Sequence, residues 1–144
     1  MKKIIAALVF GLSPMGAWAS CSLQTPMVSL GSYDPLNAAP PSVLVSVLAT
    51  CDIPTAVAIS AGRGSSNSYE KRTLAMGSQK VFYNLYVGTN KATVWGDGNF
   101  GTGVVQRMVE ADTPTQFTGN ASIYPSQSPS PGFYSDTLIF TAAF

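Results

Sequence analysis

Short runs of alternating side chains, separated by breaks rich in Gly and Pro, constrain this fold more than any other feature. Within each run, apolar residues recur with the two-residue period of a half-buried strand. After residue 19 no helix of useful length interrupts them. Regular strands with such breaks are typical of an antiparallel β-sandwich, so we predict an all-β fold of about seven strands. The runs span residues 42–51, 55–61, 81–87, 103–111, 116–124 and 132–144.

The run at residues 42–51 carries apolar side chains on both of its faces. Val45, Val47 and Ala49 share one parity, and Leu44 and Leu48 share the other. A strand that is covered on only one side alternates apolar with polar residues. We therefore expect both faces of this strand to be covered.

The last run, "GFYSDTLIFTAAF" at residues 132–144, places Tyr134, Leu138, Phe140 and Phe144 on one parity. This pattern predicts a half-buried strand whose apolar face stops at the end of the sequence. An uncovered terminal strand of this kind is an aggregation hazard. We therefore expect something to cover it, although the pattern alone does not say what.

The first nineteen residues resemble a secretory signal peptide. Lys2 and Lys3 precede the apolar stretch 4–12, and "AWA" at residues 17–19 supplies small residues at the cleavage positions. A membrane anchor is disfavoured because a bilayer span needs about 20 apolar residues. We predict a mature domain of residues 20–144. Cleavage leaves six of the eight Lys and Arg residues against seven acidic ones, a balance that does not favour nucleic acid.

Both cysteines, Cys21 and Cys51, lie in the exported portion. An even number of cysteines in an oxidising compartment predicts a disulfide. The loop of about 30 residues corresponds to roughly 3.5 kcal/mol in the chain-entropy model. A metal site would need His or more Cys, and the sequence contains no His.

Catalytic residue combinations are missing from the sequence. General acid–base catalysis most often uses His, and the GxSxG motif of serine hydrolases is absent. Glu110 and Asp112 are the only acidic residues that are close in sequence, and we interpret them as surface charges. We therefore expect no enzyme activity and no cofactor.

The stretch "WGDG" at residues 95–98 has two interpretations. Trp95 could be a platform on which a sugar stacks, with Asp97 as a polar contact. Alternatively, Asp97 and Gly98 form a tight turn and Trp95 packs as its anchor. We favour the turn, because Asp-Gly is among the strongest hairpin signals.

Several stretches in order resemble the spore coat protein U domain family, which includes pilin subunits of archaic chaperone–usher pili. They cover essentially the whole predicted mature chain, and both cysteines fit the pattern. The stretches are Cys21, "LGSYDP" (30–35), Cys51, "RTLAMG" (72–77), "VFYNLY" (81–86), "WGDG" (95–98) and "YSDTLIFTAAF" (134–144).

This resemblance implies an incomplete immunoglobulin-like antiparallel β-sandwich with an open groove for a donor strand. In such pilins a periplasmic chaperone first supplies the missing strand, and the next subunit then replaces it. The expected partners are this chaperone, an outer-membrane usher and other pilin subunits, and the expected route is export to the periplasm and then to the cell surface. The resemblance would place Tyr134, Leu138, Phe140 and Phe144 along the groove.

The sequence departs from stalk-forming members of that family before the first cysteine. Those members carry a donor segment of about a dozen alternating residues there, a length set by the rise of about 3.3 Å per residue. Here only Ser20 would precede Cys21 after cleavage. We therefore expect a subunit that accepts a strand without donating one, at a tip or terminus, with Trp95 and Phe100 as the contacts to a surface.

Two other functions fit the sequence. One is a secreted spore-coat or matrix protein that uses the fold outside any pilus. The other is a small carbohydrate-binding module with a complete fold. Dependence on a chaperone for solubility would favour the pilus subunit, and a soluble monomer would favour the module.

Overall fold

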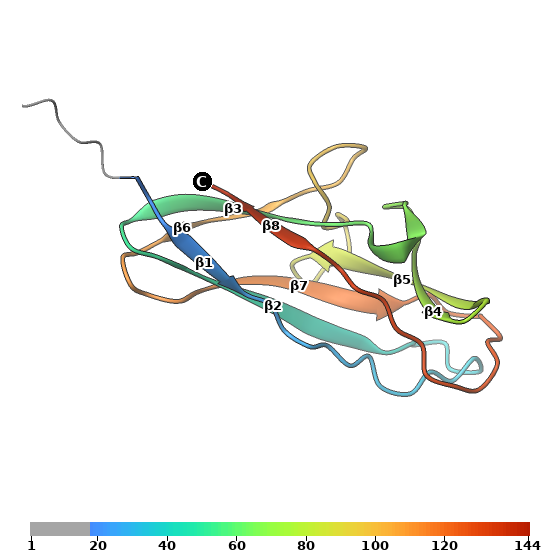
Figure 1. Cartoon of the computed structure of the whole chain (residues 1–144). Coiled ribbons are helices and arrows are strands. Elements are labelled where there is room, and N and C mark those ends of the chain that lie inside the picture. The colour runs from blue at the N-terminus through green and yellow to red at the C-terminus, as the bar shows by residue number, and fades with distance from the viewer. Residues whose placement is uncertain (1–17) are drawn as a thin grey trace, which may run out of the picture.

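The computed structural model describes residues 18–144, so most of the predicted signal peptide lies outside the described residues. Residues 18–144 form two packed sheets, as the sequence predicts (Figure 1). One sheet has the strand order β1-β2-β7-β5-β4 and the other β6-β3-β8. The elements are β1 (Cys21–Gln24), β2 (Ser42–Cys51), β3 (Thr55–Ala61), the 3-10 turn η1 (Gly64–Ser66), β4 (Arg72–Met76), β5 (Gln79–Val87), β6 (Val105–Val109), β7 (Thr115–Ile123) and β8 (Phe140–Ala143).

The β2 strand is fully buried on one face only. It pairs with β7 in a register that sets Val47 opposite Phe117, and both side chains are fully buried. On the other face Leu44 is 61% exposed. The prediction that both faces are covered is therefore wrong for Leu44, which points away from the second sheet, whereas Leu48 on the same face is half-buried.

The sequence pattern missed β4 as a strand. Its residues pair antiparallel with β5, and Leu74 lies opposite Val81. The strand opens with Arg72, a residue that normally signals an exposed position. Here Arg72 is completely buried, so a charged residue at the start of this strand does not mark an exposed position.

The last run of the sequence changes sheets. Ser135 exchanges two backbone hydrogen bonds with Ala75 of β4, with N···O distances of 2.8 and 3.0 Å. The chain then crosses to the other sheet, where β8 pairs with β3 and Thr141 lies opposite Ser60. The predicted strand over residues 132–144 is therefore only partly regular, because one segment pairs with two different sheets in turn.

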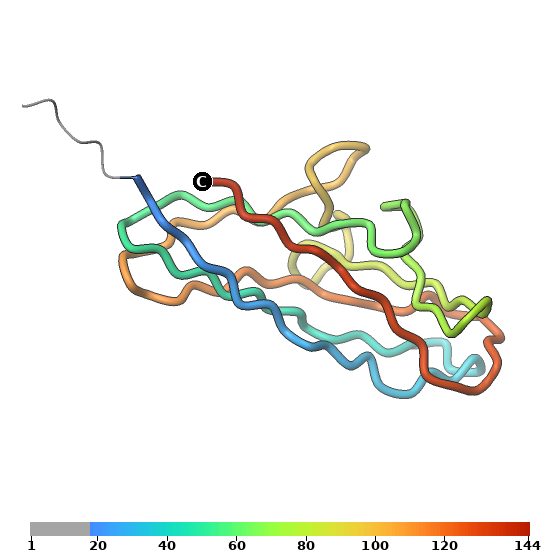
Figure 2. The backbone as a smooth tube through the Cα atoms, in the orientation of Figure 1, coloured from blue at the N-terminus to red at the C-terminus, as the bar shows by residue number. Residues whose placement is uncertain are grey.

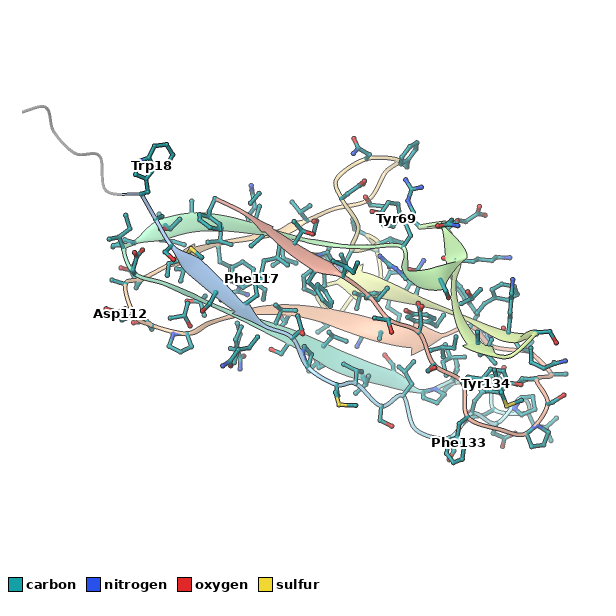
Figure 3. All side chains as sticks on the ribbon, in the orientation of Figure 1. Trp18, Tyr69, Asp112, Phe117, Phe133 and Tyr134 are labelled. Atoms are coloured by element: carbon teal, nitrogen blue, oxygen red, sulfur yellow. A yellow bond between two sulfur atoms is a disulfide. The ribbon has the colours of Figure 1, made fainter. Side chains whose placement is uncertain are left out.

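The core lies between the sheets. Val47 and Val57 contribute to it from opposite sheets, and Figure 3 shows Phe117 between the two layers. The indole of Trp95 is also fully buried there. Gly119 of β7 makes room for it, since a Cβ at that position would lie 2.5 Å from Trp95 Cε3. Trp95 is therefore a structural anchor of the sandwich.

Candidate functional site: an open groove between two edge strands

A groove of about 440 Å³ runs between the start and the end of the described chain. One wall is the segment 25–30 that follows β1, and the other is the segment 135–140 that leads into β8. In Figure 2 these two parts of the chain, blue and red, run side by side along the sandwich. The floor consists of side chains from the larger sheet: Val45, Leu74, Tyr83, Leu85 and Ala121.

The two walls of the groove are continuous with edge strands of different sheets. β1 pairs only with β2, and β8 pairs only with β3. Among residues 18–144 no strand joins β1 to β8 across the groove. Each strand therefore has one edge of backbone N–H and C=O groups without a ladder partner, the arrangement that accepts an added strand.

Of the four residues expected along a donor-strand groove, Leu138 and Phe140 line this one. Both side chains are half-buried and pack against the main core. The Phe140 ring meets Trp95 edge to face, with centroids 5.3 Å apart and an interplanar angle of 62°. An edge-to-face contact is a favourable aromatic geometry. The apolar wall of the groove is therefore continuous with the interior of the sandwich.

The prediction that Trp95 contacts an external surface is wrong. Its side chain has no solvent exposure, and its indole N–H donates a 2.8 Å hydrogen bond to the Ile59 carbonyl. The alternative interpretation, in which Trp95 anchors the turn at Asp97 and Gly98, agrees with this burial. Phe100, the other predicted contact, is 83% exposed.

Tyr134 and Phe144 do not line the groove, although they share the parity of Leu138. Tyr134 packs against a second cluster formed by Val81, Tyr83 and Ile123, because its part of the chain is still held at β4. Its hydroxyl donates to the Ser130 carbonyl at 2.7 Å. Phe144 lies beyond β8 and is more than half exposed. Tyr134 and Phe144, near the two ends of the run 132–144, therefore do not share the groove-facing direction of Leu138 and Phe140.

Asp136 is a groove residue that sequence reasoning missed. It has the parity of Leu138 and lines the groove as a carboxylate. Tyr83 Oη donates to its Oδ2 at 2.7 Å, and the backbone N–H of Ser65 donates to its Oδ1 at 2.9 Å. Burial, assisted by Asp136, raises the pKa of Tyr83. The carboxylate therefore links the groove wall to β5 and to the η1 turn.

Gly64 in the η1 turn makes this link possible. Its φ is +64°, in the left-handed region that favours glycine, and a Cβ there would overlap the Asp136 carboxylate. The parity of Asp136 with Leu138 was the available signal for its inward direction. The hydrogen-bond donors could not be foreseen, because Ser65 is 71 residues away in the sequence.

The buried guanidinium of Arg72 forms hydrogen bonds to several segments of the chain. Nη2 donates to the carbonyls of Trp95 and Gly62 at 2.6 and 2.7 Å, and Nη1 donates to Asn84 Oδ1 at 2.7 Å. Burial lowers the pKa of Arg72. Asn84 in turn donates to the carbonyl of Tyr69 at 2.8 Å. This network fixes the loop between β3 and β4 on the sandwich.

The Cys21–Cys51 disulfide, confirmed by the structure, holds the first wall of the groove to the larger sheet. The two cysteines are direct partners in the β1–β2 register. Next to them, Ser20 and Asp52 exchange two hydrogen bonds, one from Ser20 N to Asp52 Oδ1 at 2.8 Å and one from Asp52 N to Ser20 O at 3.0 Å. The chain is therefore held to this domain by covalent and hydrogen bonds from Ser20 onward.

Nothing in the described part of the chain gathers three or more His, Cys, Asp or Glu side chains into a metal site. Residues 18–144 also contain no helix that is long and apolar enough to cross a bilayer. The features that the groove does offer are apolar side chains and free strand edges. These features suit a polypeptide strand.

The fold and groove define an incomplete antiparallel β-sandwich that is open for one more strand. The sequence matches the family model of the Spore Coat Protein U domain over residues 7–141. The chain therefore belongs to the Spore Coat Protein U domain family. No curated protein matches the sequence significantly.

A solved structure is similar in fold. It is a chain from the CsuC–CsuE chaperone–tip adhesion subunit pre-assembly complex of the archaic chaperone–usher Csu pili of Acinetobacter baumannii. The TM-score is 0.64 at 17% sequence identity. The match covers 88% of the present chain and 40% of the other chain. The present chain thus corresponds to less than half of that relative.

Proposed function

We propose that this protein is an exported structural subunit of a chaperone–usher pilus or surface fibre, with no enzyme activity. Its groove accepts a strand first from a periplasmic chaperone and then from a neighbouring subunit delivered at an outer-membrane usher. The observation that carries this proposal is the open groove between β1 and β8, with Leu138 and Phe140 on its wall. A donor strand would bury these side chains and pair with the free strand edges.

The fold similarity supports this function because the Csu complex contains a chaperone and a pilus subunit. Family membership supports it as well. A coat or matrix protein outside any pilus is the rival function. It predicts a chain that is stable and soluble without a strand donor, whereas an open groove predicts dependence on one.

A pair of adjacent substitutions tests the groove. Leu138 faces the groove, and the neighbouring Ile139 is 73% exposed on the opposite parity. Leu138→Asp should abolish co-purification with a co-expressed periplasmic chaperone of the chaperone–usher class, because it buries a charge without a partner. Ile139→Asp adds the same charge one residue away and should retain chaperone binding.

Folding must be separated from strand acceptance in this test. The milder variant Leu138→Ala should form the Cys21–Cys51 disulfide normally and still bind the chaperone more weakly than the wild type. Wild-type chaperone yield for Leu138→Asp would place the strand-accepting site elsewhere. A monomeric wild-type chain that remains soluble alone and takes up no donor peptide would contradict the proposed function.

We also infer a terminal position in the fibre. Ser20 and Cys21 are held by Asp52 and Cys51, so residues from Ser20 onward are not available as a donated strand. Cleavage of residues 1–19 at the predicted site would leave the exported chain without a donor segment. Sequencing the N-terminus of the protein in isolated fibres tests this: a start near Ser20 supports a terminal subunit, and an earlier start contradicts it.

A further inference from the structure

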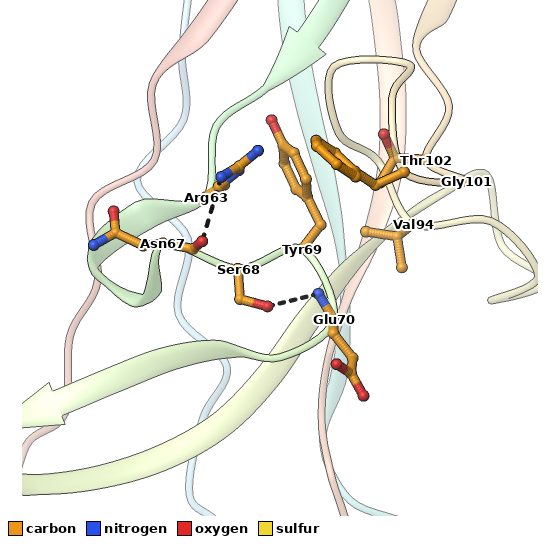
Figure 4. Close-up of a pocket in the computed structure, with 9 residues that line it drawn as sticks. Arg63, Asn67, Ser68, Tyr69, Glu70, Val94, Gly101 and Thr102 are labelled. Carbon is orange, nitrogen blue, oxygen red and sulfur yellow. Dashed lines mark hydrogen bonds between the residues drawn. The ribbon is translucent and has the colours of Figure 1, made fainter.

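A second cleft of about 500 Å³ lies away from the groove, where the loop after β3 meets the loop after Trp95. Arg63, Tyr69 and Glu70 line it from the first loop, and Phe100 and Thr102 line it from the second. Figure 4 shows Arg63 beside Tyr69, while the side chain of Glu70 points away from them. This volume falls within the range of about 300–1,000 Å³ that is usual for ligand sites.

Two aromatic rings orient the guanidinium of Arg63. Its Cζ lies 4.8 Å from the centroid of Tyr69 and 5.4 Å from that of Phe100. Among the described residues, its hydrogen bond is a long one of 3.4 Å from Nη1 to the Asn67 carbonyl. A guanidinium has five N–H donors. Arg63 is therefore held in place while most of its donors have no hydrogen-bond partner among the described residues.

Phe100 occupies a strained backbone position at the rim of the cleft. Its φ is +55°, in the left-handed region that a bulky residue rarely adopts. The ring is nevertheless 83% exposed. The fold thus bears a conformational cost of about 1–3 kcal/mol while obtaining little burial from the ring. An exposed aromatic ring held under strain is a feature that packing does not explain and that ligand stacking would.

The charges around the cleft favour a neutral ligand. Asp97 lies next to the side chain of Tyr69, which lines the cleft and carries the Arg63 guanidinium over its ring. The pKa of Asp97 is lowered mainly by the backbone N–H of Asn99. An anionic ligand would be repelled by Asp97 and a cationic one by Arg63. A hydroxyl group can accept from Arg63 and donate to Asp97 at the same time.

We propose that this cleft binds a neutral hexopyranose unit of a glycan, with the apolar face of the sugar on Phe100 and its hydroxyl groups on Arg63 and Asp97. This function goes beyond strand acceptance and does not depend on it, because no groove residue takes part. It would give a fibre-borne subunit a contact with a polysaccharide surface.

Calorimetric titration of the full exported chain, disulfide formed, tests the proposal. The probes are maltohexaose and cellohexaose as neutral glycans and hexaguluronate as an anionic glycan. We expect binding of at least one neutral probe and none of hexaguluronate. Failure of both neutral probes would overturn the proposal, and so would binding of hexaguluronate alone.

Two variants locate the binding site. Phe100→Gly removes the ring and relieves the positive φ, so it should weaken binding by about tenfold or more without lowering the melting temperature. Phe133→Ala removes an even more exposed ring from the segment before β8 and should leave binding unchanged. Unchanged affinity in Phe100→Gly would place the sugar elsewhere and overturn the proposal.

Discussion

Phe140 of the groove wall and Trp95 of the buried core touch edge to face, with ring centroids 5.3 Å apart. The wall that a donor strand would meet is therefore fixed from inside the sandwich. Trp95 is itself held by the Ile59 carbonyl and by the guanidinium of Arg72, which binds the Trp95 carbonyl. The floor and wall of the groove therefore pack together within this domain alone.

The first prediction concerns this contact. Phe140→Ala should lower the free energy of unfolding by about 2–3 kcal/mol, less than for a fully buried ring because Phe140 is only half-buried. Chemical denaturation of the domain with a donor-strand peptide bound in its groove measures the change. Phe133→Ala, which removes a ring that is 98% exposed (Figure 3), should change stability by less than about 0.5 kcal/mol. Equal effects of the two variants would show that the contact with Trp95 contributes nothing.

The second prediction is a pH dependence at Tyr83. Burial and the bond to Asp136 raise its pKa above the ordinary value of 10.0. Above about pH 10 the unfolded chain loses this proton while the folded chain keeps it, so stability is full below that pH and falls as the pH rises further. Tyr83→Phe should make the alkaline decline in melting temperature shallower. An unchanged slope would contradict the raised pKa.

The third prediction concerns the disulfide. Replacing Cys21 and Cys51 together with Ala should lower the free energy of unfolding by about 3.5 kcal/mol in the chain-entropy model. Mass spectrometry of the exported wild-type protein should show the two thiols linked within one chain. Free thiols, or a dimer bonded through either cysteine, would contradict the structure.

The fourth prediction concerns the buried charge. Arg72→Met should destabilise the domain by at least about 3 kcal/mol, because the Trp95 and Gly62 carbonyls and the Asn84 amide lose their donor. Arg72→Lys should also destabilise it, since an ammonium group cannot reproduce the planar fork of donors. A melting temperature within a few degrees of wild type for both variants would contradict this account.

The sequence predicted the strands best where local alternation and burial coincide. The limits of β2 and β3 match the predicted runs at residues 42–51 and 55–61. Alternation was less informative in the last run. Its first half contacts β4 and its second half pairs with β3. The two-residue alternation of side chains is the same whichever sheet a segment joins, so it could not predict this change of sheet.

The alternation of side chains predicted only some of the residues that line the groove. Leu138 and Phe140 follow from apolar parity, whereas Asp136 was passed over because a carboxylate does not look like a groove residue. Its partners come from distant segments, and only the tertiary structure brings the η1 turn and β5 to it. Arg72 was missed for the corresponding reason, since its burial depends on carbonyls that the fold assembles.

The last prediction tests whether the link between Asp136 and the η1 turn sets the position of the groove wall. Gly64 and Gly77 both have positive φ, +64° and +57°, so replacement by Ala strains both backbones by about 1 kcal/mol. Around Gly77 a new Cβ meets nothing within 4 Å, whereas at Gly64 it overlaps the Asp136 carboxylate. Thermal unfolding should therefore show a clearly larger loss of stability for Gly64→Ala than for Gly77→Ala.

A double-mutant cycle separates the overlap from the strain. In an Asp136→Ala background the carboxylate is gone, so Gly64→Ala should cost only the roughly 1 kcal/mol that Gly77→Ala costs. Asp136→Ala alone should cost about 1–3 kcal/mol, because the Ser65 N–H and the Tyr83 hydroxyl lose their acceptor. If Gly64→Ala is equally costly with and without the carboxylate, the turn and the groove wall are not coupled through Asp136.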